Sequence, residues 1–240
     1  MSSYEEWLVE REKLSREKQQ SFMSNIAHKL GRPRLTEKPN HPFQGSPQFW
    51  HDFSWSSEEK IQYFTSNFTA AGGHVLKLNT MEEVKAFVVN LATDTSAKYV
   101  ISQNQDVLEK MQLEKELPTI QHTVWGRNSN NNLIAMAAQA DIGIVVADYA
   151  TAYTGSITVL SSATKGRSVS LLPTILVVIV PVERLYTKLG EVLMQFDDMN
   201  KEDLPAGIHF ISGPSRSADI ENDLTIGVHG PGIVYALLVG

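Results

Sequence analysis

Over residues 57–140, blocks with apolar residues at helical spacing alternate with short, continuous apolar runs. Apolar residues at helical spacing predict helices over 57–71, 80–92, 104–111 and 133–138. Short apolar runs between them predict strands over 74–78, 98–102 and 118–123. Strands that alternate with helices of this length are typical of βαβ units, whose strands run parallel. We therefore expect an α/β fold with an open, mostly parallel sheet flanked by helices.

The second half of the chain is richer in apolar runs. These runs predict strands over 142–146, 156–160, 175–180, 208–212, 224–228 and 233–239. One helical pattern, over residues 183–196, lies among them. The runs at 175–180 and 233–239 are apolar on both faces, so they are predicted to be central strands of the sheet.

The N-terminal region has a different pattern. Residues 1–30 predict a helix that ends at Gly31 and Pro33, and its apolar positions fall near one face: Trp7, Leu14, Phe22, Ile26 and Leu30. We expect this stripe to pack on the body of the protein or on a partner. Residues 32–57 mix four prolines with five aromatic residues, which predicts an extended arm wrapped over the main domain. The predicted division is therefore an N-terminal helix and arm, 1–56, and an α/β domain, 57–240.

Composition narrows the possible partners and cofactors. The 240 residues carry a formal net charge of −6, which disfavours nucleic acid and anionic membrane as partners. No cysteine is present, so the usual ligands of iron–sulfur clusters are missing and we expect no cofactor in this chain. No metal-ligand spacing such as H-E-x-x-H occurs, so no metal site is predicted, and histidines other than His229 are interpreted as structural or exposed.

The same sequence argues against several classes of protein. The longest apolar run, 175–180, is too short for a membrane helix, and the charged N-terminus does not resemble a secretory signal. A cytoplasmic location is therefore expected. The chain has no P-loop, no G-x-S-x-G and no G-x-G-x-x-G pattern, which disfavours P-loop nucleotidases, α/β-hydrolases and nicotinamide-binding Rossmann domains.

Two segments that follow predicted strands carry candidate binding residues. After strand 142–146, Thr154 and Ser156 offer hydroxyl groups and Gly155 permits close approach of the backbone, although a plain loop has the same composition. The second segment, 211–221, predicts a strand that runs into a Gly-Pro turn and then a short helix capped by Ser215 or Ser217. Its candidate residues are Ser212, Gly213, Ser215, Arg216 and Asp219. Arg216 has a donor fork suited to a carboxylate, or it pairs with Asp219 instead.

A third segment, 227–232, predicts a tight loop between the last two strands. His229 in this loop titrates near neutral pH and Gly230 follows it, but a histidine in a turn often only bonds to the backbone. Arg167 is a further candidate for the same cleft. Because ligands of open α/β sheets bind beyond the carboxyl ends of strands, we expect the loops around residues 154, 215 and 230 to form one polar pocket.

Several motifs together resemble one known family. The runs FISGPSRSADIE (210–221), GVHGPG (227–232) and YALLV (235–239) are similar to the C-terminal signature of the lactate utilization protein C family, a part of the LUD-domain group. Further similar segments are SFMSNIAHKLGRPR (21–34), HPFQGSPQFW (41–50), ADIGIVVADYATAYTGSITVLSS (140–162) and KGRSVSLLPTILVVIVP (165–181).

The resemblance implies a fold and a function. The fold is expected to be similar to the sugar-phosphate isomerase and CoA-transferase-like (NagB/RpiA-type) architecture. The implied function is L-lactate degradation to pyruvate, which allows growth on lactate, together with two companion proteins that carry iron–sulfur clusters. A small carboxylate ligand and a homo-oligomer are both compatible with this expectation.

Two positions depart from the pattern of many relatives, so no catalytic residue is assigned. Tyr153 stands where many relatives have an acidic residue, and Thr174-Ile175-Leu176 stands where many have a histidine. Whether the chain is itself an enzyme therefore stays open. The alternative to a subunit of a lactate system is an independent, small-anion-binding enzyme of the isomerase or CoA-transferase type.

Overall fold

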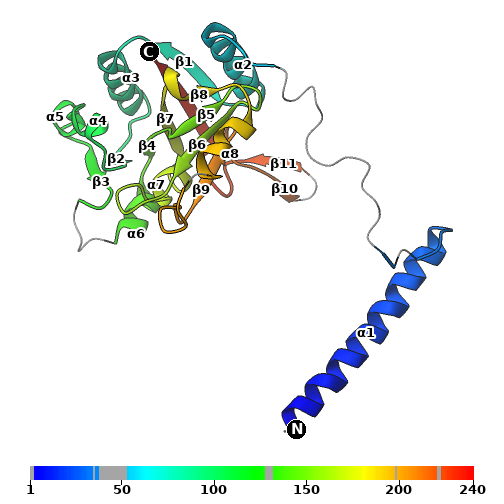
Figure 1. Ribbon diagram of the computed structural model, residues 1–240. Helices are drawn as coiled ribbons and strands as arrows, with labels where there is room; N and C mark the ends of the chain where they lie inside the picture. Colours follow the sequence, from blue (N-terminus) through cyan, green and yellow to red (C-terminus); the bar gives the residue numbers. More distant parts are fainter. Residues whose placement is uncertain (1–2, 35, 38–52, 128–131, 198, 221–222) are drawn as a thin grey trace. The chain divides into compact units, whose positions relative to one another are not determined.

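The computed structural model describes residues 3–34, 36–37, 53–127, 132–197, 199–220 and 223–240 (Figure 1). The chain falls into two compact units, Met1–Phe53 and Ser54–Gly240, and each is described by itself. None of the helices in these residues is long and apolar enough to cross a membrane.

The first unit contains one long helix, α1 (Ser3–Lys29). Gly31 ends it with a positive φ of 63°, and the Arg32 amide donates to the carbonyl of Ala27. The predicted helix and its end are thus confirmed. The apolar side chains of its predicted stripe, Trp7 and Phe22 among them, are exposed. Most of the predicted aromatic arm, residues 38–52, lies outside the described residues.

The second unit is built around a six-stranded sheet. Its strands are β1 (His74–Leu78), β2 (Tyr99–Ser102), β3 (Gln121–Val124), β4 (Ile142–Val146), β7 (Ile175–Pro181) and β12 (Ile233–Val239). They pair in the order β1-β12-β7-β4-β2-β3, and every pairing is parallel. The predicted open parallel sheet is confirmed, and β7 and β12 lie in its interior as their apolar runs indicate.

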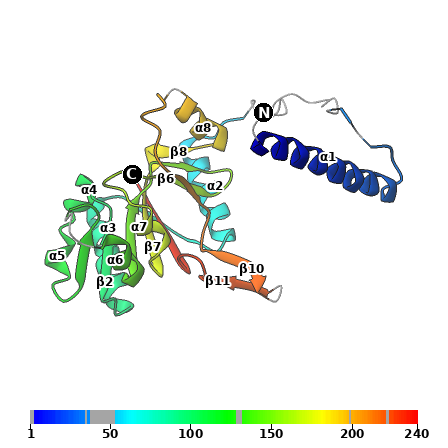
Figure 2. The same cartoon turned by 90° about the horizontal axis from the view of Figure 1, so that it is seen from below.

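Helices cover both faces of this sheet (Figures 1 and 2). One face packs against α3 (Met81–Asp94), α4 (Asp106–Glu109) and α5 (Leu113–Glu116). The other packs against α2 (Ser57–Ala70), α6 (Leu133–Gln139) and α7 (Ser168–Leu171). In β4, Ile142, Ile144 and Val146 belong to the core on the side of α3, α4 and α5, and Val145 to the core on the side of α2, α6 and α7, because alternate residues of a strand face opposite sides.

A second sheet packs on the face that α2 covers. Its strands are β5 (Tyr149–Thr151), β6 (Ser156–Leu160), β8 (Leu185–Tyr186) and β9 (Ile208–Ile211), in the order β8-β5-β6-β9. Buried Ile157 and Leu185 join the same core cluster as Phe64 and Phe68 of α2. The sequence pattern indicates the longer strands here but not that they form a separate sheet.

One predicted helix is wrong, and another begins later than predicted. The helix predicted after the Gly-Pro turn does not form: Arg216–Ile220 is strand β10, which pairs antiparallel with β11 (Asp223–Ile226) in a projecting hairpin (Figures 1 and 2). Residues 183–196 form a helical turn, η2 (Val182–Arg184), then β8, and only then α8 (Leu189–Asp197). The Glu191 carboxylate accepts a hydrogen bond from the amide of Thr187, which lies just before α8. This bond stabilises the N-terminus of the helix at this position.

Candidate functional site

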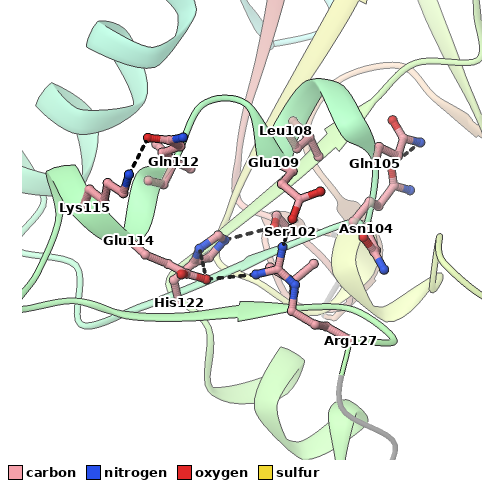
Figure 3. A pocket seen from close by; sticks show the side chains of 13 residues that line it. Ser102, Asn104, Gln105, Leu108, Glu109, Gln112, Glu114, Lys115, His122 and Arg127 are labelled. Atoms are coloured by element: carbon pink, nitrogen blue, oxygen red, sulfur yellow. Dashed lines mark hydrogen bonds and ion pairs between the residues drawn. The ribbon is translucent and has the colours of Figure 1, made fainter.

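A polar pocket lies beyond the carboxyl ends of β2 and β3 (Figure 3). Its volume is about 200 Å³, and ten of the 13 residues that line it are polar. Lining residues are Ser102, Gln103, Asn104, Gln105, Leu108, Glu109, Gln112, Leu113, Glu114, Lys115, His122, Val124 and Arg127.

The pocket lies next to the point where the winding of the sheet reverses direction. From β2 the chain moves outward to β3, then returns to β4 on the other side of β2 and continues to β7 and β12. The direction of winding therefore reverses between β2 and β4, and ligands of open α/β sheets bind beyond the carboxyl ends of strands at such a point. Above β2 and β4 themselves, the Asn104 amide donates to the carbonyl of Thr164 at 3.0 Å. This contact brings the loop after β6 over that part of the crevice, so the pocket opens on the β3 side.

His122 is the central titratable group of the pocket. Its Nε2 lies 2.9 Å from Ser102 Oγ, and its Nδ1 lies 3.7 Å from Glu114 Oε1 (Figure 3). Only 11% of its side chain is exposed. Burial lowers the pKa of His122 below its usual value of 6.5, Glu114 opposes this effect, and Arg127 adds to it. The lowered pKa favours the neutral imidazole at pH 7. The neutral ring carries one proton, either on Nδ1 or on Nε2.

Arg127 holds two carboxylates at the mouth of the pocket. Its Nη2 lies 2.8 Å from Glu109 Oε1 and its Nη1 lies 3.2 Å from Glu114 Oε1 (Figure 3). All three side chains are well exposed, so these ion pairs contribute little to stability. Their effect is to fix Glu114 next to His122. The left-handed conformation of Gln112, at φ 49°, turns the chain between α4 and α5 and places both glutamates on the pocket.

Gln103 forms the buried end of the pocket and is 1% exposed. Its Oε1 accepts a hydrogen bond from the Val146 amide at 3.2 Å, which fixes the orientation of the side-chain amide. Its Nε2 is buried and has no hydrogen-bond partner among the described residues, and the same holds for His122 Nδ1. Buried polar groups are almost always hydrogen-bonded, so each of these two atoms is open to a further partner, either water or a ligand.

The candidate residues Thr154 and Gly155 lie in the turn between β5 and β6 and Ser156 begins β6; none of the three lines this pocket. Ser156 Oγ lies 2.7 Å from Ser212 Oγ. Gly155 has a φ of 56°, and a Cβ there would lie 2.6 Å from the backbone nitrogen of Phe68. Glycine is therefore required by the close approach of α2, while Thr154 is exposed.

Gly213 and Arg216 contact the end of the same helix. Gly213 has a φ of 94°, and a Cβ there would lie 2.8 Å from the carbonyl oxygen of Ala71. The guanidinium of Arg216 donates a hydrogen bond to that same oxygen. The predicted helix start, with its free amides, does not exist at this place because the segment is a strand. Asp219 lies in β10, in the part of that strand whose side chains are not described.

Ser215 and the loop 227–232 lie side by side. The Ser215 amide donates to the carbonyl of Pro231, and the Gly227 amide donates to the carbonyl of Ser215, both at 2.9 Å. A hollow of about 490 Å³ lies beside this loop, where β7 and β12 begin. It is lined by Leu171, Leu172, Thr174, Ile226, Gly227, Val228, His229, Gly230 and Gly232. The structure thus brings the loops at 215 and 230 together, but at the amino edge of the large sheet, and residues 154–156 do not line this hollow.

Arg167 lies in a different place again. A Cβ on Gly207 would lie 3.0 Å from Arg167 Cδ, 2.8 Å from His209 Nε2 and 3.3 Å from Ser161 Oγ, so these groups surround one glycine. Burial lowers the pKa of His209, and the positive charge of Arg167 lowers it further. Among the described residues, no group of three or more histidine, aspartate or glutamate side chains is placed to hold a metal ion.

The pocket residues Gln103 and His122 are not among the candidates that the sequence pattern indicates. A signal for them exists, because the polar run Gln103-Asn104-Gln105 directly follows a predicted strand and His122 lies in the next one. Parallel pairing of β2 and β3 opposes Ser102 with Val124 and so brings the two segments together.

Comparison with known proteins identifies the family. The profile of the LUD domain matches residues 61–239. Lactate utilization protein C of Halalkalibacterium halodurans is 36% identical over 218 residues, which are 90% of this chain and 94% of the relative. That of Shouchella clausii is 34% identical over 220 residues, 88% of this chain and 93% of the relative. The chain belongs to the LUD domain family.

A solved structure supports the LUD fold. The crystal structure of a DUF162 family protein from Deinococcus radiodurans superimposes with a TM-score of 0.58 at 17% identity, and covers 78% of this chain and 99% of that one. The matched LUD domain begins within α2, so both the polar pocket and the glycine-rich loops lie inside it. In this LUD domain Tyr153, at the position expected to be acidic in many relatives, stacks with Trp55 at 6.1 Å between ring centroids.

Proposed function

We propose that this protein is a component of an L-lactate utilization system, which degrades lactate to pyruvate and supports growth on lactate. The observation that carries this proposal is the near full-length match to relatives named lactate utilization protein C. The match at 36% identity spans 94% of the Halalkalibacterium halodurans protein, so it includes far more than one shared motif. Fold alone does not give a function, whereas a match over the whole length supports a shared role.

We further propose that this chain works with companion proteins that carry iron–sulfur clusters, in the cytoplasm. Oxidation of lactate to pyruvate releases two electrons, which need an acceptor. The chain has no cysteine, the usual ligand of such clusters, so a cluster in this system would be held by another chain. The formal charge of −6 favours small molecules and proteins over nucleic acid as partners.

Deletion of the gene in its own host tests the role in lactate use. We expect the deletion strain to lose growth on L-lactate as sole carbon source and to keep growth on glucose. A plasmid copy of the gene should restore growth on lactate. Normal growth of the deletion strain on L-lactate, in a host with no second copy of the gene, would contradict the proposed role.

Affinity purification under anaerobic conditions tests the partners separately. A tagged chain, expressed from its own locus during growth on lactate, should co-purify with proteins that contain iron and acid-labile sulfide. A matched purification from cells grown on glucose is the control. Recovery of the tagged chain alone from lactate-grown cells would contradict the iron–sulfur partners and leave the role in lactate use standing.

A further inference from the structure

We propose that the polar pocket beyond β2 and β3 binds a small 2-hydroxy or 2-oxo carboxylate, L-lactate or pyruvate. The place of the site rests on the geometry of the pocket. The class of ligand rests in addition on the proposed function.

Two residues that line the pocket each have a buried polar atom without a partner among the described residues, Gln103 Nε2 and His122 Nδ1. An amide nitrogen is always a donor, and its orientation is fixed because the oxygen of the same side chain accepts the Val146 amide. A buried donor without a partner costs about 1–3 kcal/mol. A ligand that brings an acceptor oxygen to Gln103 removes this cost.

The tautomer of His122 follows from its neighbours. The carboxylate of Glu114 lies 3.7 Å from Nδ1, too far for a hydrogen bond but close enough to favour a proton on that nitrogen. Nε2 then accepts the hydroxyl proton of Ser102 across 2.9 Å. With the proton on Nδ1, both unpartnered atoms are donors, so the ligand they suit has acceptor oxygens such as a hydroxyl or a keto group.

Two cationic side chains line the pocket beside the carboxylates of Glu109 and Glu114. Lys115, whose Nζ lies 2.9 Å from Gln112 Oε1, and Arg127 both line it. Arg127 is shared by two glutamates on the exposed side, where water screens their charge. A ligand with a carboxylate at the mouth and a hydroxyl or keto oxygen at the buried end matches both parts of the pocket.

The pocket is large enough for a ligand of this size. At about 30 Å³ per water molecule in the liquid, a volume of about 200 Å³ holds roughly six or seven water molecules. L-lactate and pyruvate each have six non-hydrogen atoms. Nucleotides and CoA are several times larger than either acid.

Titration of the purified full-length chain with L-lactate and with pyruvate tests the proposal without any mutation. Side-chain resonances of the histidines are followed by nuclear magnetic resonance, and the affinity is measured by calorimetry. We expect the resonances of His122 to shift on addition of either acid, and those of His229 to stay in place. The absence of binding at millimolar ligand, or shifts at His229 or His209 with none at His122, would overturn the proposal.

Two matched pairs of variants give an independent test. His122→Phe keeps a ring in the buried position and removes both nitrogens, and Arg127→Gln removes the charge at the exposed mouth. Each should weaken binding about tenfold or more, whereas His229→Phe and Arg216→Gln should leave it unchanged. Arg127→Gln changes an exposed side chain, so it tests the site even if His122→Phe fails to fold. Unchanged binding in the folded pocket variants refutes the site.

Failure of this proposal and failure of the proposed function have different signatures. A deletion strain that loses growth on lactate, combined with a purified chain that binds neither acid, refutes the site alone. A chain that binds L-lactate through His122, encoded by a gene whose loss leaves growth unchanged, refutes the role in lactate use alone.

Discussion

Gly143→Ala is expected to destabilise the second unit strongly, because α7 packs directly on β4 at this glycine. A Cβ on Gly143 would lie 2.2 Å from the carbonyl oxygen of Val169 and 2.8 Å from Cγ of Pro173. Val169 is fully buried, so its carbonyl moves only if α7 moves with it. Overpacking a core costs roughly 1–3 kcal/mol, and a backbone obstacle places this change near 3. For a unit of this size, that corresponds to a fall of about 6–12 °C in the melting temperature.

Gly190→Ala is the matched control for this change. Gly190 lies in α8, and a Cβ there would meet nothing within 4 Å. The same exchange should therefore leave stability unchanged or raise it by about 0.4–1 kcal/mol. Thermal unfolding followed by circular dichroism at a single pH compares the two variants with the wild type. A melting temperature of Gly143→Ala within about 2 °C of the wild type would refute the packing of α7 on β4.

Two further predictions concern charge. Because the pKa of His122 is lowered on folding, the unfolded chain binds more protons as the pH falls through 6.5, so the free energy of unfolding should decrease with acid. Urea unfolding between about pH 8 and pH 5 should show a smaller decrease in the free energy of unfolding for His122→Phe than for the wild type. The decrease that remains comes in part from His209, whose pKa is also lowered on folding. The same dependence on pH in the variant and the wild type would contradict this. Lys165→Met leaves the largely buried carboxylate of Asp148 without its 2.6 Å partner and should cost about 3 kcal/mol. Lys85→Met, in a more exposed pair, should cost less than about 1 kcal/mol in the same assay, and equal costs would contradict the difference in burial.

The large sheet is predictable from sequence because its strands are buried on both faces. A strand such as β7 is apolar at nearly every position, and its neighbours along the chain are helices with a clear period. Segment 183–196 misleads because β8 pairs with β5, more than thirty residues earlier in the chain, and this pairing leaves no local pattern. Strand β10 is predicted as a helix for the same reason. It is polar, and its pairing with β11 is not visible in the pattern of residues 211–221.

The site is harder to predict because a glycine required for packing looks the same in sequence as one required for a ligand. Gly155 and Gly213 lie against the end of α2, at Phe68 and Ala71, and the protein itself fills the space beside them. The side chains of the polar pocket come from two strand ends and the short helices between them. Without the pairing of β2 with β3, nothing in the sequence places Gln103 near His122.

The choice between Arg216 and the polar pocket as the place for a small ligand depends on whether the site has donors that are not already bonded. Arg216 donates to the carbonyl of Ala71 at the carboxyl end of α2, where the helix dipole favours a positive charge. A ligand at Arg216 would have to break that bond, so its net gain is small. At Gln103 and His122 the donors are buried and unpartnered within the described residues, so a ligand oxygen gains a hydrogen bond without breaking one. The GPSRS segment thus joins the hairpin to α2, while the unbonded donors lie in residues 102–127, outside the segments on which the resemblance to the family is based.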